Sequence, residues 1–135
     1  MDLQGMMDGI NKMNREVRSR YHLTLGQAIS MLSKLPQDTS VIYDFNNKSP
    51  KGPHSFRGHY SDLAFEWSGD EVTIRDFVSE LNASWGKTFT GYKGGDFIMD
   101  AETPLWAAEY GECGRAIIGI LKHKNEIILT TKEIE

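Results

Sequence analysis

The ten residues Lys87–Asp96 (KTFTGYKGGD) constrain the fold more than any other stretch of the chain. They hold three glycines, two aromatic residues, two lysines and two threonines, and they begin where a helical pattern ends. Glycine adopts positive φ readily and lets the backbone approach a ligand closely. Two structures fit this composition. One is a ligand-binding loop, and the other is a tight glycine turn between two strands whose aromatic residues belong to the core.

A second stretch of the same character, His54–Tyr60, lies upstream, and acidic residues are absent from it and from the first stretch up to Asp96. No Asp or Glu occurs between Asp44 and Asp62, or between Glu80 and Asp96, although the chain carries a net charge of −4. Lysine, arginine and histidine do occur in these intervals, and aromatic faces can stack on a base. We therefore expect the two stretches to meet and to hold a small phosphorylated, base-containing molecule.

The composition indicates a single globular domain. The chain has 135 residues, of which 39% are hydrophobic and 25% charged, and one cysteine, Cys113. A single cysteine cannot form an internal disulfide, which favours a reducing compartment. No apolar run approaches the length of about 18 residues that spans a bilayer. We expect a soluble, cytoplasmic protein that binds neither a membrane nor long nucleic acid, because a duplex-binding protein usually presents a broad basic face.

The first 20 residues predict a helix, Asp2–Arg20, with a heptad-like apolar seam. Its apolar residues are spaced alternately by three and four positions: Leu3, Met6, Ile10, Met13 and Val17. Such a narrow seam suits another helix. The helix packs either on its own domain or on a second copy of itself, and its terminal position favours self-association. We accordingly divide the chain into an oligomerisation helix, residues 1–22, and a nucleotide-binding domain, residues 23–135.

The remaining pattern predicts an α+β fold with three helices in all and a small antiparallel sheet. Thr24 with Gln27 forms a capping box for a helix that Pro36 ends, and Thr73 begins a third helix that Gly86 terminates. Residues 46–53 predict a loop, since they contain Asn-Asn, Gly and two prolines. The predicted strands are 40–45, 60–67, 97–100 and 105–110, followed by a closing hairpin of 115–121 and 126–130.

The potential catalytic groups are sparse. The four histidines are scattered and there is one cysteine, so the sequence predicts no metal site and no cofactor. Asp96, Asp100 and Glu102 leave one alternative open, a metal-dependent phosphodiesterase or nuclease. We otherwise expect a binding protein that is not an enzyme. The predicted ligand-binding residues are Arg57, His59, Tyr60, Phe89, Thr90, Tyr92, Lys93 and Arg115.

Three segments resemble a known family. Ser55–Ala64 (SFRGHYSDLA), Gly86–Asp96 (GKTFTGYKGGD) and Thr103–Trp106 (TPLW) resemble small phage and prophage proteins, the Thoeris anti-defence sponges that sequester cyclic ADP-ribose signals. The resemblance covers roughly residues 23–120. Arg57 lies inside the shared motif, and Arg115, Phe89, Tyr92 and Lys93 are the other positions that the resemblance suggests for the pocket.

The resemblance implies an antiparallel sheet with helices, and amino-terminal helices that join protomers into a homo-oligomer, from dimer to hexamer. It implies a glycocyclic ADP-ribose ligand, made by a bacterial TIR enzyme and bound intact near a protomer interface. Arginines would bind the phosphates, with aromatic and polar groups on the adenine and the riboses. Some family members are also similar in holding cyclic trinucleotides at separate sites. The implied role is evasion of host immunity in the cytoplasm of a phage-infected bacterium.

Overall fold

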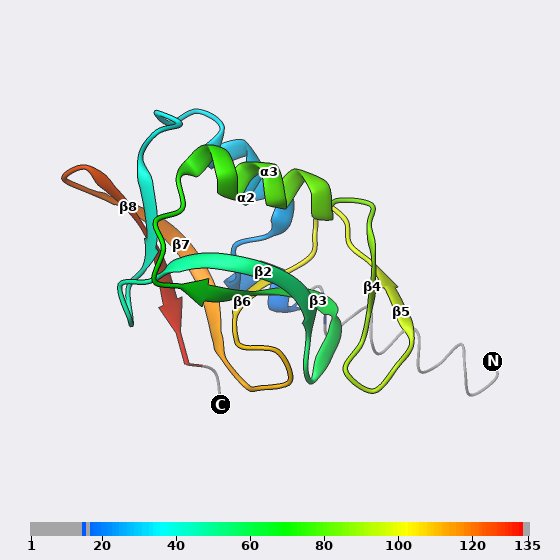
Figure 1. The fold of residues 1–135 in the computed structure, drawn as a ribbon. Helices are drawn as coiled ribbons and strands as arrows, with labels where there is room; N and C mark the ends of the chain where they lie inside the picture. The colour runs from blue at the N-terminus through cyan, green and yellow to red at the C-terminus, as the bar shows by residue number, and fades with distance from the viewer. Residues whose placement is uncertain (1–14, 16, 134–135) are drawn as a thin grey trace.

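The computed structural model describes residue 15 and residues 17–133, and Figure 1 shows its arrangement. Residues 17–21 are helical. Two further helices follow, α2 (Leu25–Leu32) and α3 (Ile74–Ser84). The strands are β1 (Ser40–Tyr43), β2 (Ser49–Phe56), β3 (His59–Ser68), β4 (Thr88–Thr90), β5 (Asp96–Ile98), β6 (Leu105–Ala107), β7 (Arg115–His123) and β8 (Glu126–Lys132).

Six strands form one sheet in the order β1-β8-β7-β6-β3-β2, and β4 and β5 form a second, two-stranded sheet. The expected α+β class is confirmed. The expectation of a purely antiparallel sheet is wrong, because β1 pairs with β8, and β3 with β6, in parallel. A parallel pair needs a long crossover connection. The segment that contains α3 supplies it between β3 and β6, a pairing that local turn signals do not reveal.

The helices α2 and α3 lie together over the large sheet, as Figure 1 shows. The apolar side of α2, formed by Leu25, Ala28 and Leu32, is buried. Phe77 of α3 packs edge-on against Phe65 of β3, with ring centroids 5.1 Å apart. Burial of these side chains removes apolar surface from water, which is the main stabilising contribution to such a fold.

The predicted helix boundaries are largely confirmed. The Thr24 hydroxyl accepts from the Gln27 backbone, and the Gln27 side chain accepts from the Thr24 N–H, which completes the capping box. Thr73 caps α3 with one such bond, since its hydroxyl accepts from the Asp76 backbone N–H. Gly86 follows the end of α3 with a φ of +79°, a conformation that glycine adopts without strain. The helix α2 ends at Leu32, before Pro36.

The predicted loop at residues 46–53 is wrong, because Ser49–Pro53 belong to β2. This strand is the last in the sheet order and forms a ladder with β3 alone. Proline has no backbone N–H to donate, and an edge strand tolerates Pro50 and Pro53 because only one of its sides is hydrogen-bonded to a neighbouring strand. The upstream stretch His54–Tyr60 is likewise a hairpin between β2 and β3. Its turn is Arg57–Gly58, and Gly58 has a φ of +105°.

The stretch Lys87–Asp96 forms the hairpin of β4 and β5, which confirms the predicted glycine turn between two strands. Phe89 faces Phe97 across the hairpin and belongs to the hydrophobic core. Gly94 and Gly95, in the turn, both have positive φ. The aromatic residues are divided, since Phe89 is buried while Tyr92 remains 44% exposed.

Most of the predicted helix Asp2–Arg20, including four of its five seam residues, lies outside the described residues. The described part contacts the α+β unit. Arg15 pairs with Asp100 and Arg18 pairs with Asp62, at 2.6 and 2.7 Å. Val17, the last seam residue, is 45% exposed. The division into residues 1–22 and 23–135 and the self-association of the helix stay predictions.

Candidate functional site

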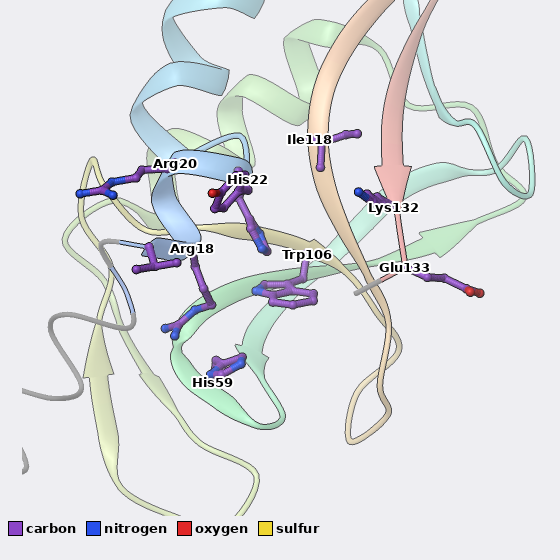
Figure 2. A pocket seen from close by; sticks show the side chains of 10 residues that line it. Arg18, Arg20, His22, His59, Trp106, Ile118, Lys132 and Glu133 are labelled. Carbon is purple, nitrogen blue, oxygen red and sulfur yellow. The ribbon is translucent and has the colours of Figure 1, made fainter. Parts of the chain in front are cut away.

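A large pocket lies where the first helix ends against the sheet (Figure 2). Its volume is about 1120 Å³. The helix and its end contribute residues from Val17 to His22, the sheet contributes one residue from each of β3, β6, β7 and β8, and Glu133 follows β8. The lining residues are Val17, Arg18, Arg20, Tyr21, His22, His59, Trp106, Ile118, Lys132 and Glu133.

Trp106 forms the aromatic base of this pocket, packed among three other rings. Phe56 stacks on it at a centroid distance of 4.1 Å and an interplanar angle of 8°. His22 meets it edge-on at 4.5 Å, and His59 lies nearly parallel to it at 6.0 Å. Tyr21, which is 69% exposed, adds a ring on the helix side. The pocket therefore combines a fixed indole with an accessible phenol.

Asp62, which is fully buried, connects the helix to this aromatic base. Its carboxylate accepts from Nε and Nη2 of Arg18 at 2.7 and 2.9 Å, and from Nε1 of Trp106 at 2.9 Å. A buried carboxylate is tolerated when charged and hydrogen-bonding partners compensate its loss of hydration. Asp62 is the acidic residue of the SFRGHYSDLA segment, at the inner end of the upstream hairpin.

The two pocket histidines are shifted toward their neutral forms. Burial lowers the pKa of His22, against the raising effect of its hydrogen bond with the Leu105 carbonyl. Burial, and then the nearby Arg18 guanidinium, lower the pKa of His59. Because a carbonyl can only accept, Nδ1 of neutral His22 is the protonated nitrogen that donates to Leu105 at 3.1 Å. The positive charge of the pocket therefore comes from arginine and lysine.

Arg18, Arg20 and Lys132 are the cationic side chains of the pocket, and Glu133 is its acidic one. Glu133 is paired with Arg115 at 3.2 Å, outside the pocket lining. Figure 2 shows the arginines and Lys132 on opposite sides of Trp106. An anionic, ring-containing molecule matches this combination, because cations can contact its charged groups while its ring lies near aromatic side chains.

The two acid-free stretches do meet, as expected, at the tips of their hairpins. The Arg57 guanidinium lies over the Tyr92 ring at 4.7 Å, and its Nη1 donates to the Gly111 carbonyl at 2.7 Å. Tyr92 also packs against Tyr110, with centroids 5.7 Å apart. We call this meeting of Arg57, Tyr92, Tyr110 and Gly111 the turn junction. Its contacts account for part of the hydrogen-bonding capacity of Arg57.

The other predicted ligand-binding residues are distributed over several places. His59 lines the large pocket, and Tyr60 stacks against Phe97 with centroids 5.9 Å apart. Thr90 donates to Asp96 at 3.4 Å, and Lys93 is exposed in the β4–β5 turn. The position of Phe89 is a correction, because its ring is 9% exposed within the core and packs there rather than offering an open face.

Arg115 lies at a second, smaller pocket of about 410 Å³ together with Phe45, Trp67 and the exposed Cys113. Its guanidinium lies 5.3 Å from the Phe45 ring centroid, and its Nε donates to the Thr131 hydroxyl at 2.8 Å. The predicted set is therefore spread over the large pocket, the turn junction, the smaller pocket and the core.

Sequence reasoning missed Arg18, Arg20, His22 and Lys132 as site residues. A signal for the first three was present, since Arg18 and Arg20 lie at the end of the predicted helix Asp2–Arg20 and His22 follows it. For that helix, self-association was favoured over packing on its own domain. Lys132 carried no signal, because its proximity to the helix depends on the long-range pairing of β8 within the sheet.

The three carboxylates of the alternative hypothesis do not gather. In the part of the chain that the structure describes, no group of three metal-ligating side chains lies close enough to hold an ion. Asp100 accepts from Arg15 and from the Glu102 backbone N–H, and Asp96 accepts from Thr90. Asp96 and Asp100 therefore each accept hydrogen bonds from other groups of the protein.

No family model, curated protein or solved structure matches the chain. No described helix combines the length and the apolar character that a bilayer crossing requires.

Proposed function

We propose that this protein binds a phosphorylated, base-containing small molecule in the large pocket and holds it without cleaving it. The observation that carries this proposal is the meeting of Arg18, Arg20 and Lys132 with an aromatic base in one hollow of about 1120 Å³. Small-molecule pockets commonly have volumes of about 300–1000 Å³. The space is thus sufficient for a ligand larger than a mononucleotide.

The physical chemistry of the lining favours such a ligand. An arginine guanidinium presents a planar set of donors that matches phosphate oxygens. Each charge-assisted hydrogen bond contributes about 1.5–3 kcal/mol, and stacking of a base contributes about 1–3 kcal/mol. Two phosphate contacts with one stacked base would support micromolar or tighter binding after the costs of ordering.

The ligand class that we propose is cyclic ADP-ribose, specifically its glycocyclic isomers. The support is the resemblance of the SFRGHYSDLA, GKTFTGYKGGD and TPLW segments to the Thoeris anti-defence sponges, together with a pocket suited to phosphates and a base. The proposed role is sequestration of an immune signal in the bacterial cytoplasm by a phage-encoded homo-oligomer. Cyclic trinucleotides are a further ligand class under the same proposal.

The decisive experiment separates binding from turnover. We expect calorimetry to show binding of glycocyclic ADP-ribose, and mass spectrometry of the heat-denatured complex to recover the molecule unchanged. Recovery of a cleaved product would instead support a phosphodiesterase. Absence of binding to cyclic ADP-ribose isomers and cyclic trinucleotides alike would reject the sponge.

Two substitutions assign binding to the large pocket. Arg20→Ala and Lys132→Ala should each weaken binding about tenfold, because each removes a cation near the phosphates. The matched controls are Arg75→Ala and Lys122→Ala, which remove exposed cations that do not line the pocket. Equal losses in the controls would show a general charge effect.

The turn junction is the second place where predicted ligand-binding residues meet, and Arg57→Ala tests its contribution. A loss of about tenfold or more would assign contacts at the junction to the ligand, since a charged donor would be gone. Unchanged affinity would leave binding to the large pocket, and the role of Arg57 would then be its contacts with Tyr92 and Gly111.

A further inference from the structure

Asp62 is a charged side chain beneath the large pocket that does not line it. The residue is fully buried, and its two carboxylate oxygens accept three hydrogen bonds, two from Arg18 and one from the Trp106 indole. Both donors belong to residues that do line the pocket. One buried carboxylate therefore holds a pocket cation and the pocket's aromatic base at the same time.

The geometry of the Arg18–Asp62 pair fixes how the guanidinium is turned. Asp62 is contacted by Nε and Nη2, the two nitrogens along one edge of the planar fork. Among the contacts of the described residues, none involves Nη1 of Arg18. A guanidinium held along one edge by a buried anion keeps donors on its other edge, and its orientation needs no further ordering when an anion arrives.

The same carboxylate fixes the indole. Oδ2 accepts from Nε1 of Trp106 and from Nε of Arg18, at 2.9 and 2.7 Å. The cation and the ring are therefore held by one shared oxygen, and the distance between them cannot change unless this contact breaks. Phe56 stacks on Trp106 and so restrains the ring further.

We propose that Asp62 is the positioning residue of the pocket. It holds the guanidinium of Arg18 in one orientation beside Trp106 and leaves the edge that Asp62 does not contact for an anionic group of the ligand. This inference rests on the proposed function, because it names the group that orients a cation of that pocket. Asp62 itself does not contact the ligand.

The test is binding of glycocyclic ADP-ribose by calorimetry to the wild type, Asp62→Asn and a matched control. Asp62→Asn keeps the size and the oxygen acceptor shared by Trp106 and Nε of Arg18, but it removes the negative charge and faces Nη2 of Arg18 with an amide N–H₂ group, which cannot accept. We expect affinity to fall about tenfold or more. The control is Asp100→Asn, which breaks another ion pair between the first helix and the domain, Arg15–Asp100, away from the pocket lining. We expect its affinity to stay within about twofold.

A double-mutant cycle separates positioning from a general structural role. If Asp62 acts through Arg18, Arg18→Ala should weaken binding as much as Asp62→Asn, and the double variant should be no worse than either. Additive losses would overturn the proposal. Arg18→Lys provides a second variant that keeps the charge at both positions but loses the planar fork. Wild-type affinity in Arg18→Lys would also overturn it.

The outcomes distinguish this proposal from the function on which it rests. A wild type that binds no cyclic ADP-ribose isomer and no cyclic trinucleotide refutes the proposed function, and the positioning role is refuted with it. A wild type that binds while Asp62→Asn binds equally well refutes only the positioning role. Equal losses in Asp62→Asn and Asp100→Asn also refute it, because they would report docking of the helix.

Discussion

At the scale of single residues, His22 makes the stability of the protein depend on pH. Its side chain is 4% exposed and its folded-state pKa is lowered from 6.5, chiefly by burial. As pH decreases through 6.5, His22 binds a proton more readily in the unfolded chain than in the folded chain, so the free energy of unfolding falls. Each pKa unit of difference corresponds to about 1.4 kcal/mol.

We therefore expect urea unfolding to show lower stability at pH 5 than at pH 7, and His22→Phe to reduce that difference. The control is His123→Phe, at the exposed end of β7, which should leave the pH dependence unchanged. An identical pH dependence in the wild type and in His22→Phe would show that another group causes the effect.

Residue-level prediction from sequence succeeded where the signal was local. Thr24 with Gln27 and Gly86 were identified because capping geometry is contained within a few residues. Asp62 was not identified as the centre of a site, because its partners Arg18 and Trp106 are each 44 positions away in the chain. Only the three-dimensional fold brings them together.

At the scale of elements, the approach of β7 to β6 depends on a glycine. A Cβ on Gly114 would lie 2.1 Å from the Ala107 carbonyl oxygen and 2.6 Å from the Ala108 Cβ. These distances are far below van der Waals contact, and the Ala107 oxygen is backbone that cannot rotate away. Gly114→Ala should therefore force β6 and β7 apart and destabilise the fold by about 3 kcal/mol, at the upper end of overpacking effects.

The matched control is Gly69→Ala, in the turn after β3, where a Cβ would meet nothing within 4 Å. Its free energy of unfolding should stay within about 0.5 kcal/mol of the wild type. Thermal and chemical denaturation of the two variants measure the difference. Equal stabilities would mean that the approach at Gly114 relaxes at little cost.

Elements with periodic patterns were predicted well, whereas β2 was not. The closing hairpin of β7 and β8 is visible in the sequence, and in β8 the hydrophobic periodicity reflects burial. The alternation in β3 predicted a strand correctly, although the four consecutive residues Asp62–Phe65 are all buried. In β2 the residues Pro50, Gly52 and Pro53 resemble a loop, and only its place at the end of the sheet order permits them. Likewise the parallel pairings could not be read from neighbouring turns.

At the scale of the whole molecule, the two ends of the six-stranded sheet lie beside each other, so that the sheet is nearly closed. The strands β1 and β2 are in contact, although they are not joined as a regular ladder. The large pocket draws on four successive strands of this sheet, β8, β7, β6 and β3, so their direct pairing brings its sheet residues together. The first helix then covers this side of the sheet, held there by Asp62 and Asp100.

The side chain of Ser49 connects β2 to β1 where the sheet nearly closes. It is 3% exposed, its hydroxyl donates to the Val41 carbonyl of β1 at 2.7 Å, and it accepts from the Val72 N–H at 3.2 Å. Ser49→Ala should therefore leave a buried acceptor and a buried donor unpaired, at a cost of about 1–3 kcal/mol. The control is Ser61→Ala in β3, a half-buried serine with no side-chain hydrogen bond among the described residues, which should cost less than about 0.5 kcal/mol.

Hydrogen exchange gives the spatial test, because loosening should raise exchange at Val41 and Val72 before it reaches the β7–β8 hairpin. Uniform exchange across the sheet in Ser49→Ala would show that the hydroxyl stabilises the fold as a whole rather than its seam.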